Sequence, residues 1–293
     1  MTVLEVIQRS TDFLAKKGVD SPRLQTEWLL ARVLQVPRLK LYLGFDQKLS
    51  ESELDAIREL VRRRGDREPL QHILGSASFC GVEIKVGPQV LVPRPETELL
   101  AERAWQQLST CAAPRPAALD YGTGSGCIAI ALALRCSTAE IHALDVSAEA
   151  LAVASANATA NGVADRIRFH SGDGFSGLAE KQSYDLIVSN PPYIPSAEID
   201  TLSPEVREYD PRLALDGGPD GLDFYRGLAA DAAGFLRPEG RMMLEFGDGQ
   251  SEQIRKLLVQ HNWIVESVEA DYSGKPRILA ARRQAEGRGF SAG

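Results

Sequence analysis

The sequence has few cysteines and few histidines. Its 293 residues include four of each, and no two cysteines form a CxxC pair. Metal sites need such ligands at close spacing, and small secreted folds need many cysteines for their disulfides. The sequence therefore predicts no metal site, and it indicates a reduced, cytoplasmic protein.

Long apolar runs are also missing. The longest, residues 127–134, is far shorter than the roughly 18 residues that a membrane-spanning helix needs. The first residues carry scattered charges and no separate apolar block, which argues against a signal peptide. We therefore expect no association with a membrane.

Basic residues are fewer than acidic ones, and the two kinds are distributed unevenly along the chain. The net charge is −7, but residues 1–75 hold 13 Lys/Arg against 11 Asp/Glu, which is +2 and leaves −9 for the remainder. An acidic surface repels the phosphate backbone of DNA and RNA. We therefore expect no stable binding of nucleic acid.

Residues 1–75 have the periodicity of a small helical domain. A second helix is expected to open near Thr26, and a third at Ser50, where Glu53 completes a capping box. The third helix ends in the basic run 62–64. This run can either complement the helix dipole or bind a partner, and the sequence leaves both readings open.

The remainder of the chain predicts an α/β domain. Residues 76–94 are expected to form a β-hairpin linker, with strands at 82–86 and 90–92. Strands and helices then alternate over 95–283, which predicts a Rossmann-like, mostly parallel sheet of seven strands. The tail, 284–293, is expected to be disordered. The expected strands are 117–121, 141–145, 167–171, 186–189, 241–246, 263–269 and 277–282.

A glycine-rich loop follows the first strand of this sheet. Glycines there let a ligand approach the backbone closely. A dinucleotide fingerprint would need glycine at Cys127, and Asp120, just before the loop, would repel a pyrophosphate but attract an ammonium group. S-adenosylmethionine has an ammonium group and no phosphate, so it is favoured over NAD. The loop residues are Gly122, Thr123, Gly124, Ser125 and Gly126.

Acidic residues end the next two strands. Asp145 can accept hydrogen bonds from both ribose hydroxyls of an adenosyl group. Asp173, next to Gly174, can accept one from the adenine amine, and Phe175 can wall the ring. Because the carboxyl ends of parallel strands meet at one edge of the sheet, these residues predict an adenosyl site.

The fourth strand runs into Asn190, Pro191, Pro192 and Tyr193. A planar nitrogen whose lone pair is delocalised is a poor nucleophile, and it needs acceptors that hold its N–H groups. The Asn190 oxygen and the Pro191 carbonyl can serve, while Tyr193 can lie flat on the planar target. The pattern therefore predicts methylation of an amide or amino nitrogen.

Together these segments resemble the HemK/PrmC family, the protein-(glutamine-N5) methyltransferases of peptide chain release factors. The resemblance covers nearly the whole chain, and the pairing of PRPETE with NPPY is its most specific feature. The matching segments are EPLQHILG (68–75), VPRPETELL (92–100), DYGTGSGCIAIALA (120–133), NPPYIP (190–195), DPRLALDGGPDGL (210–222) and GKPR (274–277).

The resemblance implies a class I methyltransferase that uses S-adenosyl-L-methionine and releases S-adenosyl-L-homocysteine. It implies that the glycine loop and Asp145 hold the cofactor, with Asp173, Gly174 and Asn190 alongside. It also implies that residues 190–193 hold the glutamine of the Gly-Gly-Gln motif of class 1 release factors, with Asn190 as the catalytic residue. The helical domain would help to dock this substrate, and methylation would modulate translation termination.

The chain departs from the family pattern at two positions. Cys80 and Gly174 stand where the family usually has aromatic residues, and the second change affects the adenine contact. Arg94 and Glu98 can either order the entrance to the cofactor pocket or cap a helix, and the sequence does not decide between these roles.

Two other functions fit the same motifs. A DNA or RNA amino-methyltransferase faces the same chemistry, but it needs a basic groove, which the charge of −9 does not provide. A non-catalytic protein that binds S-adenosylmethionine would not need Asn190, which is present. Methylation of release factor glutamine is therefore the expected function.

Overall fold

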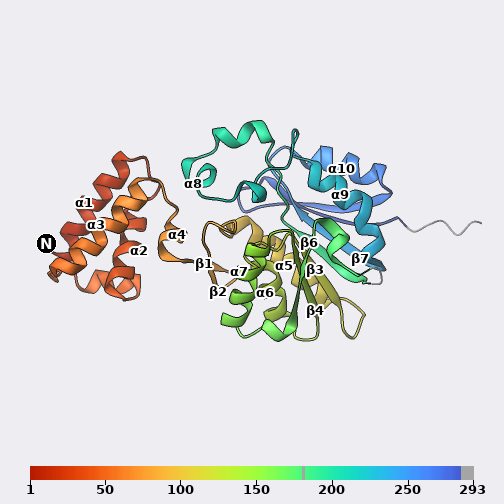
Figure 1. Ribbon diagram of the computed structural model, residues 1–293, viewed down its shortest axis with the longest axis horizontal. Helices are drawn as coiled ribbons and strands as arrows, with labels where there is room; N and C mark the ends of the chain where they lie inside the picture. The colour runs from red at the N-terminus through yellow and green to blue at the C-terminus, as the bar shows by residue number, and fades with distance from the viewer. Residues whose placement is uncertain (180–181, 285–293) are drawn as a thin grey trace, which may run out of the picture. The chain divides into compact units, whose positions relative to one another are not determined.

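The computed structural model describes residues 1–179 and 182–284 and divides the chain into two compact units (Figure 1). The helical unit consists of Met1–Ala77 together with Leu202–Asp210, and the sheet unit holds the other described residues. Of the expected tail only Gln284 is described, and its N–H donates to the carbonyl of Asn262. The other residues of that tail lie outside the described ranges.

The helical unit packs short helices around an apolar core. Thr2 and Ser50 cap the first and third helices, each with a capping box, as expected for the third. The second helix begins earlier than expected, at Pro22, because proline suits the first helical position. Its elements are α1 (Val3–Lys16), α2 (Pro22–Leu34), η1 (Arg38–Leu43), α3 (Glu51–Gly65), α4 (Leu70–Leu74) and α8 (Pro204–Arg207).

The basic run at the end of α3 makes ion pairs inside this unit. Arg62 pairs with Glu59 and Asp66, and Arg63 pairs with Glu68. Arg64, which is almost fully buried, bonds to Gln25 and to Glu205 of the returning segment. The run is thus engaged in structural contacts.

The segment Leu202–Asp210 is held to the helical unit by the carboxylate of Glu205. One of its oxygens accepts from Arg64 at 2.7 Å and the other from Arg67 at 2.6 Å. The Tyr209 hydroxyl also donates to the carbonyl of Asp66 at 3.2 Å. A segment distant in sequence therefore completes the helical domain.

The hairpin differs from the one expected. β1 (Ser76–Phe79) pairs with β2 (Val82–Lys85), and residues 86–94 form no strand, so the expected strand at 90–92 was wrong. Cys80 and Gly81 both have positive φ, which a two-residue type I′ turn requires. Val90 is buried although it belongs to no strand. The apolar residues at 90–92 that suggested a strand therefore reflect burial rather than strand pairing.

The seven-stranded, mostly parallel sheet is confirmed. Its order is β5-β4-β3-β6-β7-β9-β8, in which β3 to β7 run parallel and β9 runs antiparallel to both of its neighbours. The strands are β3 (Ala117–Tyr121), β4 (Glu140–Asp145), β5 (Ile167–Ser171), β6 (Tyr184–Ser189), β7 (Leu236–Glu245), β8 (Trp263–Ala270) and β9 (Pro276–Arg283).

Helices cover both faces of this sheet (Figure 1). Alternate residues of each strand enter separate cores: Leu186 and Val188 face one, and Ile187 faces the other. One face carries α5 (Pro95–Ser109), α6 (Cys127–Arg135) and α7 (Ala148–Ala160), and the other carries α9 (Asp223–Asp231) and α10 (Ser251–Gln260). Short 3-10 turns are η2 (Ala164–Arg166), η3 (Gly174–Gly177), η4 (Ser196–Thr201), η5 (Arg212–Ala214) and η6 (Ala232–Phe235).

The strand order reverses at β3. The chain passes from β3 outward through β4 to β5, and then returns to add β6 on the other side of β3. Open α/β sheets bind ligands outside the carboxyl ends of the strands at such a reversal. The fold thus predicts a site above β3, β4 and β6.

Candidate active site

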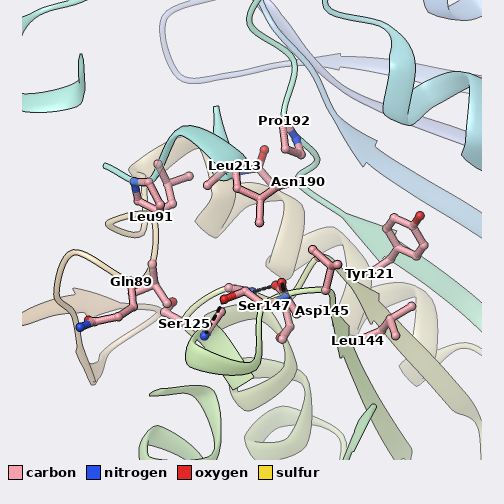
Figure 2. A pocket seen from close by; sticks show the side chains of 18 of the residues that line it. Gln89, Leu91, Tyr121, Ser125, Leu144, Asp145, Ser147, Asn190, Pro192 and Leu213 are labelled. Carbon is pink, nitrogen blue, oxygen red and sulfur yellow. Dashed lines mark hydrogen bonds between the residues drawn. The ribbon is translucent and has the colours of Figure 1, made fainter. Parts of the chain in front are cut away.

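A cavity of about 310 Å³ lies within the sheet unit at this edge. Loops after the parallel strands line it, and Figure 2 shows Asn190, Pro192 and Leu213 across the hollow from Asp145 and Ser147. Most of the site residues expected from the sequence line it: Gly122, Thr123, Gly124, Ser125, Asp145, Asp173, Gly174, Asn190 and Pro192. Separate loops thus bring these residues together.

The glycine loop presents bare backbone to the cavity. The N–H groups of Gly122 and Thr123 both donate to the carbonyl of Leu144 at 2.9 Å, which fixes the loop against β4. Gly122 and Gly124 have positive φ, and a Cβ built on either would meet no atom within 4 Å. Side chains here would project into the open space, so the loop fits a ligand that lies directly on the backbone.

Gly126 was expected to bind the cofactor, but it does not line the cavity. It is the N-cap of α6, with φ of +81°. A Cβ there would lie 2.9 Å from the Cβ and 3.1 Å from the Cα of Ala154 in α7. The structure therefore explains this glycine by helix packing.

Gly126→Ala should lower the free energy of unfolding by about 1–3 kcal/mol, because the new methyl group overlaps Ala154 and the left-handed φ is strained. Gly124→Ala is the matched control, since it shares the positive φ but opens onto free space. Urea denaturation without ligand measures both variants. Equal losses would show that the close contact with Ala154 has no energetic weight.

Asp145 is held at the cavity wall by backbone N–H groups. Its Oδ2 accepts from Gly124 at 2.8 Å, and its Oδ1 accepts from Ser147 at 2.9 Å (Figure 2). A carboxylate oxygen has a second lone pair, so each one can also accept from a hydroxyl. Asp145 can therefore order the glycine loop and hold a ribose at once.

Asp120 does not reach the cavity as the ammonium contact would require. It is buried beneath the loop, where Oδ2 accepts from the Thr123 hydroxyl at 2.6 Å and from the Ala129 N–H at 3.0 Å. Within the described chain its Oδ1 has no partner, and burial raises the pKa of Asp120 to about 7. In the structure it shapes the loop and the start of α6.

The aromatic wall near Asp173 and Gly174 is Tyr121, which the sequence analysis did not select. Phe175, which was expected from the sequence to wall the adenine ring, does not line the cavity. Its ring stacks on Phe235, with centroids 4.6 Å apart, and meets Tyr121 at 5.0 Å. Phe175 therefore supports the wall from behind, and Tyr121 faces the space.

Two residues of the NPPY segment do not line the cavity. Pro191 is buried, and the Tyr193 ring lies against Gly247, where a built Cβ would be 3.0 Å from its Cδ2. The Tyr193 carbonyl accepts from Gln250 Nε2 at 2.9 Å, and burial raises the pKa of Tyr193 to about 12. The Tyr193 ring therefore packs against Gly247, just before α10, and its flat contact with a substrate stays a prediction.

Asn190 has its amide nitrogen engaged by α5. Its Nδ2 donates to the Thr97 hydroxyl oxygen at 3.0 Å, and Thr97 is a buried residue in the first turn of that helix. No described residue donates to Asn190 Oδ1. The acceptor end of this side chain is thus left for a ligand.

Two loops complete the cavity with residues that the sequence analysis did not single out. The first follows the hairpin and contributes Gln89 and Leu91, and the second contributes Leu213 (Figure 2). The first loop directly precedes and enters the segment VPRPETELL, and the second belongs to the segment DPRLALDGGPDGL. Their place in these two segments, which carry the family resemblance, was the sequence feature that could have pointed to them. Arg94 lines the cavity and makes no side-chain cap on α5, whereas Glu98 does not line it.

The structure also bears on metal binding, membrane spanning and cysteine chemistry. In the described residues no group of three or more His, Cys, Asp or Glu side chains could hold a metal ion. No helix within 1–179 or 182–284 is long and apolar enough to cross a bilayer. All four cysteines are free thiols, and burial raises the pKa of Cys80 to about 12.

Comparisons with known proteins agree with this geometry. Two family models match, the PrmC N-terminal domain over residues 5–75 and the methyltransferase small domain over residues 96–203. Among solved structures, the catalytic domain of hMettl16 superposes with a TM-score of 0.54 at 15% identity, over 81% of this chain and 84% of that one. At that identity the likeness shows a shared fold.

Curated relatives match along almost their whole length. The release factor glutamine methyltransferase of Geobacter sulfurreducens is 45% identical over 282 residues, which are 96% of each chain. That of Chlorobaculum tepidum is 46% identical over 289 residues, covering 97% of this chain and 98% of the relative. This protein therefore belongs to the release factor glutamine methyltransferase family.

Proposed function

We propose that this protein transfers a methyl group from S-adenosyl-L-methionine to the side-chain amide nitrogen (N5) of the glutamine in the Gly-Gly-Gln motif of class 1 peptide chain release factors. Translation termination would be modulated as a result, in the cytoplasm. The observation that carries the proposal is Asn190, whose acceptor end lines the same cavity as the glycine loop and Asp145.

The chemistry explains why an amide side chain suits this position. The sulfonium of the cofactor supplies an electrophilic methyl carbon, and a glutamine amide is a weak nucleophile because its lone pair is delocalised. Asn190 Oδ1 accepts one N–H of that amide, holds the nitrogen in line and stabilises its developing positive charge. The C–S bond breaks as the C–N bond forms, and the surplus amide proton leaves to water.

The cofactor would lie along the edge formed by β3, β4 and β5. Gly122 and Gly124 give its chain room against the backbone, and Asp145 accepts from its ribose hydroxyls. Tyr121, Asp173 and the loop at Gly174 surround the adenine position. Of the two acceptors expected to hold the substrate amide, Asn190 lines the cavity and Pro191 does not, so the proposal rests on Asn190.

The helical unit offers a surface for the protein substrate. Leu39 and Leu43 are 72% and 89% exposed, and Trp28 and Tyr42 are half-exposed beside them on α2 and η1. Arg38 lies 5.6 Å from the Trp28 ring, and the Tyr42 hydroxyl donates to buried Glu27 at 2.9 Å. Apolar side chains fixed in this way are typical of protein interfaces.

Leu43→Glu should raise KM for a full-length release factor by about 10-fold while leaving kcat unchanged, because a charge would be buried on docking. A short Gly-Gly-Gln peptide should show no change. Val259→Glu, at an exposed position of α10, is the control. Initial rates with both substrates measure the effect, and an unaltered KM for the release factor would remove this surface from docking.

A labelled-methyl assay tests the function itself. The purified protein is offered release factor, a Gly-Gly-Gln peptide, DNA and rRNA in parallel, and mass spectrometry locates the added methyl group. We expect label on the glutamine of the release factor and, more weakly, on the peptide. Label on nucleic acid alone would overturn the proposal in favour of an amino-methyltransferase of DNA or RNA.

A further inference from the structure

One glutamine side chain, Gln250, connects three loops at the carboxyl edge of the sheet. Its Nε2 donates to the carbonyl of Tyr193, which follows β6, at 2.9 Å and to the carbonyl of Gly221 at 3.4 Å. Its Oε1 accepts from the N–H of Gly247, which follows β7, at 2.9 Å. Gln250 is 8% exposed and does not line the cavity, so it can act on a ligand only through the loops that it holds.

The three partners determine the orientation of the Gln250 amide. Gly247 offers an N–H, which needs an acceptor, whereas Tyr193 and Gly221 offer carbonyl oxygens, which need a donor. The reversed amide would place oxygen against oxygen and NH2 against N–H, so only one orientation satisfies all three partners. Gln250 is the N-cap residue of α10, yet its side chain makes no cap bond to that helix. The side chain therefore holds the loops rather than the helix.

The carbonyl that Gln250 holds belongs to a stiff segment that begins at Asn190. Each proline at 191–192 has a fixed φ, and a residue that precedes a proline is restricted to extended conformations. Where β6 ends, the Ser189 hydroxyl donates to the carbonyl of Tyr121 at 2.6 Å. Few backbone torsions are left free between this bond and Tyr193, so a displacement of Tyr193 is transmitted to Asn190.

Glycines of the segment DPRLALDGGPDGL pack closely against the same turn. A Cβ built on Gly221, whose φ is +75°, would lie 2.4 Å from the Tyr193 oxygen and 2.7 Å from Gln250 Nε2. A Cβ on Gly217 would lie 2.9 Å from both the Pro192 oxygen and the Tyr193 Cα. The Tyr193 carbonyl is thus enclosed by backbone and by the Gln250 amide.

We propose that Gln250 is a positioning residue, which holds the Tyr193 carbonyl and thereby fixes the turn at residues 190–193 and the position of Asn190 on the cavity wall. This inference rests on the proposed function, because the position of Asn190 matters when its oxygen must accept an N–H of the substrate amide. Thr97 holds the side-chain amide of Asn190, and Gln250 holds the backbone that carries it. A misplacement of about 1 Å in such a group can cost about 10²-fold in rate.

Gln250→Glu tests this role most sharply, because it replaces only the Nε2 group. The ionised carboxylate can still accept from Gly247, but it places an oxygen against the carbonyls of Tyr193 and Gly221. At about pH 8.5, kcat with a Gly-Gly-Gln peptide should fall by about 10- to 100-fold, with the dissociation constant for S-adenosylmethionine unchanged. Gln253→Glu, at an exposed position of α10, is the matched control and should keep the wild-type rate.

Acid should restore the rate of Gln250→Glu, which a loss of folding would not. A protonated carboxyl can donate its O–H to the Tyr193 carbonyl in place of Nε2, and burial beside carbonyl oxygens raises the pKa of the new carboxyl. The protonated form is the active one, so the rate rises as the pH falls through that pKa. The ratio of variant to wild-type kcat should therefore increase by about 5-fold or more between about pH 8.5 and about pH 6.

The ionisable groups on the surrounding elements are common to both proteins. Burial raises the pKa of Glu245 to about 7, so this carboxyl titrates in the range of the experiment, but it does so in the wild type as well. The ratio of the two rates therefore isolates the new carboxyl. The groups are Glu252 in α10, Asp223 in α9, Glu245 in β7, Asp248 in the next loop, Arg277 in β9 and the phenol of Tyr193.

A second substitution covers the case in which Gln250→Glu does not fold. Gln250→Met removes all three hydrogen bonds and should lower kcat by about 10- to 100-fold at every pH, without recovery in acid. Wild-type kcat in either variant at about pH 8.5 would overturn the proposal. A ratio for Gln250→Glu that does not rise in acid would overturn it too.

Hydrogen exchange without substrate separates this proposal from the proposed function. The amides of Ile194 and Ser196 follow the turn and donate to the carbonyls of Leu215 and Gly218 at 3.0 and 2.9 Å. Both should exchange faster in Gln250→Glu than in the wild type at about pH 8.5, because the turn is released. If the wild type methylates no glutamine, the proposed function fails while this difference still supports positioning, and equal exchange would contradict the positioning role.

Discussion

Asn190→Ala should lower kcat by about 10²–10³-fold while leaving the affinity for S-adenosylmethionine nearly intact. The substitution removes a preorganised acceptor aimed at the charge that develops on the substrate nitrogen, and such groups act mainly in the transition state. Single-turnover methylation of a Gly-Gly-Gln peptide measures the rate, and calorimetry measures cofactor binding.

The same experiment contains its own control. If Asn190→Ala binds the cofactor with wild-type affinity, the cavity is intact and the lost rate belongs to the missing amide. Because Nδ2 of Asn190 also bonds to Thr97, the thermal stability of the variant should be compared as well. Unchanged turnover would show that the amide does not hold the substrate, and the proposed mechanism would then be wrong.

Asp145→Ala should raise the dissociation constant for S-adenosylmethionine by about 10-fold or more. Each lost charge-assisted hydrogen bond to a ribose hydroxyl is worth about 1.5–3 kcal/mol, and about 1.4 kcal/mol is a factor of ten in affinity. The variant also releases the N–H groups of Gly124 and Ser147, which loosens the glycine loop. At saturating cofactor, kcat should be largely retained, because Asp145 does not touch the reacting nitrogen.

Two further substitutions calibrate this result. Asp165→Ala changes an exposed aspartate in η2 and should leave the affinity at the wild-type value. Asp173→Ala should have an intermediate effect, since it is expected to accept a single hydrogen bond from adenine. Equal affinity of Asp145→Ala and the wild type in calorimetry would remove Asp145 from the cofactor site.

The sequence predicted the sheet because strands and helices alternate along most of the domain, up to the final pair β8 and β9. It also predicted most of the residues that gather at its edge, since the carboxyl ends of parallel strands meet whatever the conformation of the loops. The hairpin was misplaced because the turn at Cys80 and Gly81 has only one glycine, while Gly87 and Pro88 look like a stronger turn signal.

The direction in which a loop side chain points could not be predicted from the alternation of strands and helices. No periodicity operates beyond a strand end, so the sequence could not show that Tyr193 packs on Gly247 or that Phe175 lies behind Tyr121. Thr97, the hydrogen-bond partner of Asn190, was overlooked because its neighbours Glu96 and Glu98 are typical of the first turn of any helix.

The salt bridges from Arg64 and Arg67 to Glu205 have a consequence for truncation experiments. The two units are not consecutive modules, because the polypeptide leaves the sheet unit after Thr201 and re-enters it at Pro211. A shortened protein starting at Ser78 would keep Glu205 but discard both arginines, which leaves this carboxylate without its partners 15 residues after Asn190. Any loss of activity in such a fragment would mix poorer substrate capture with damage to the enzyme's own interior.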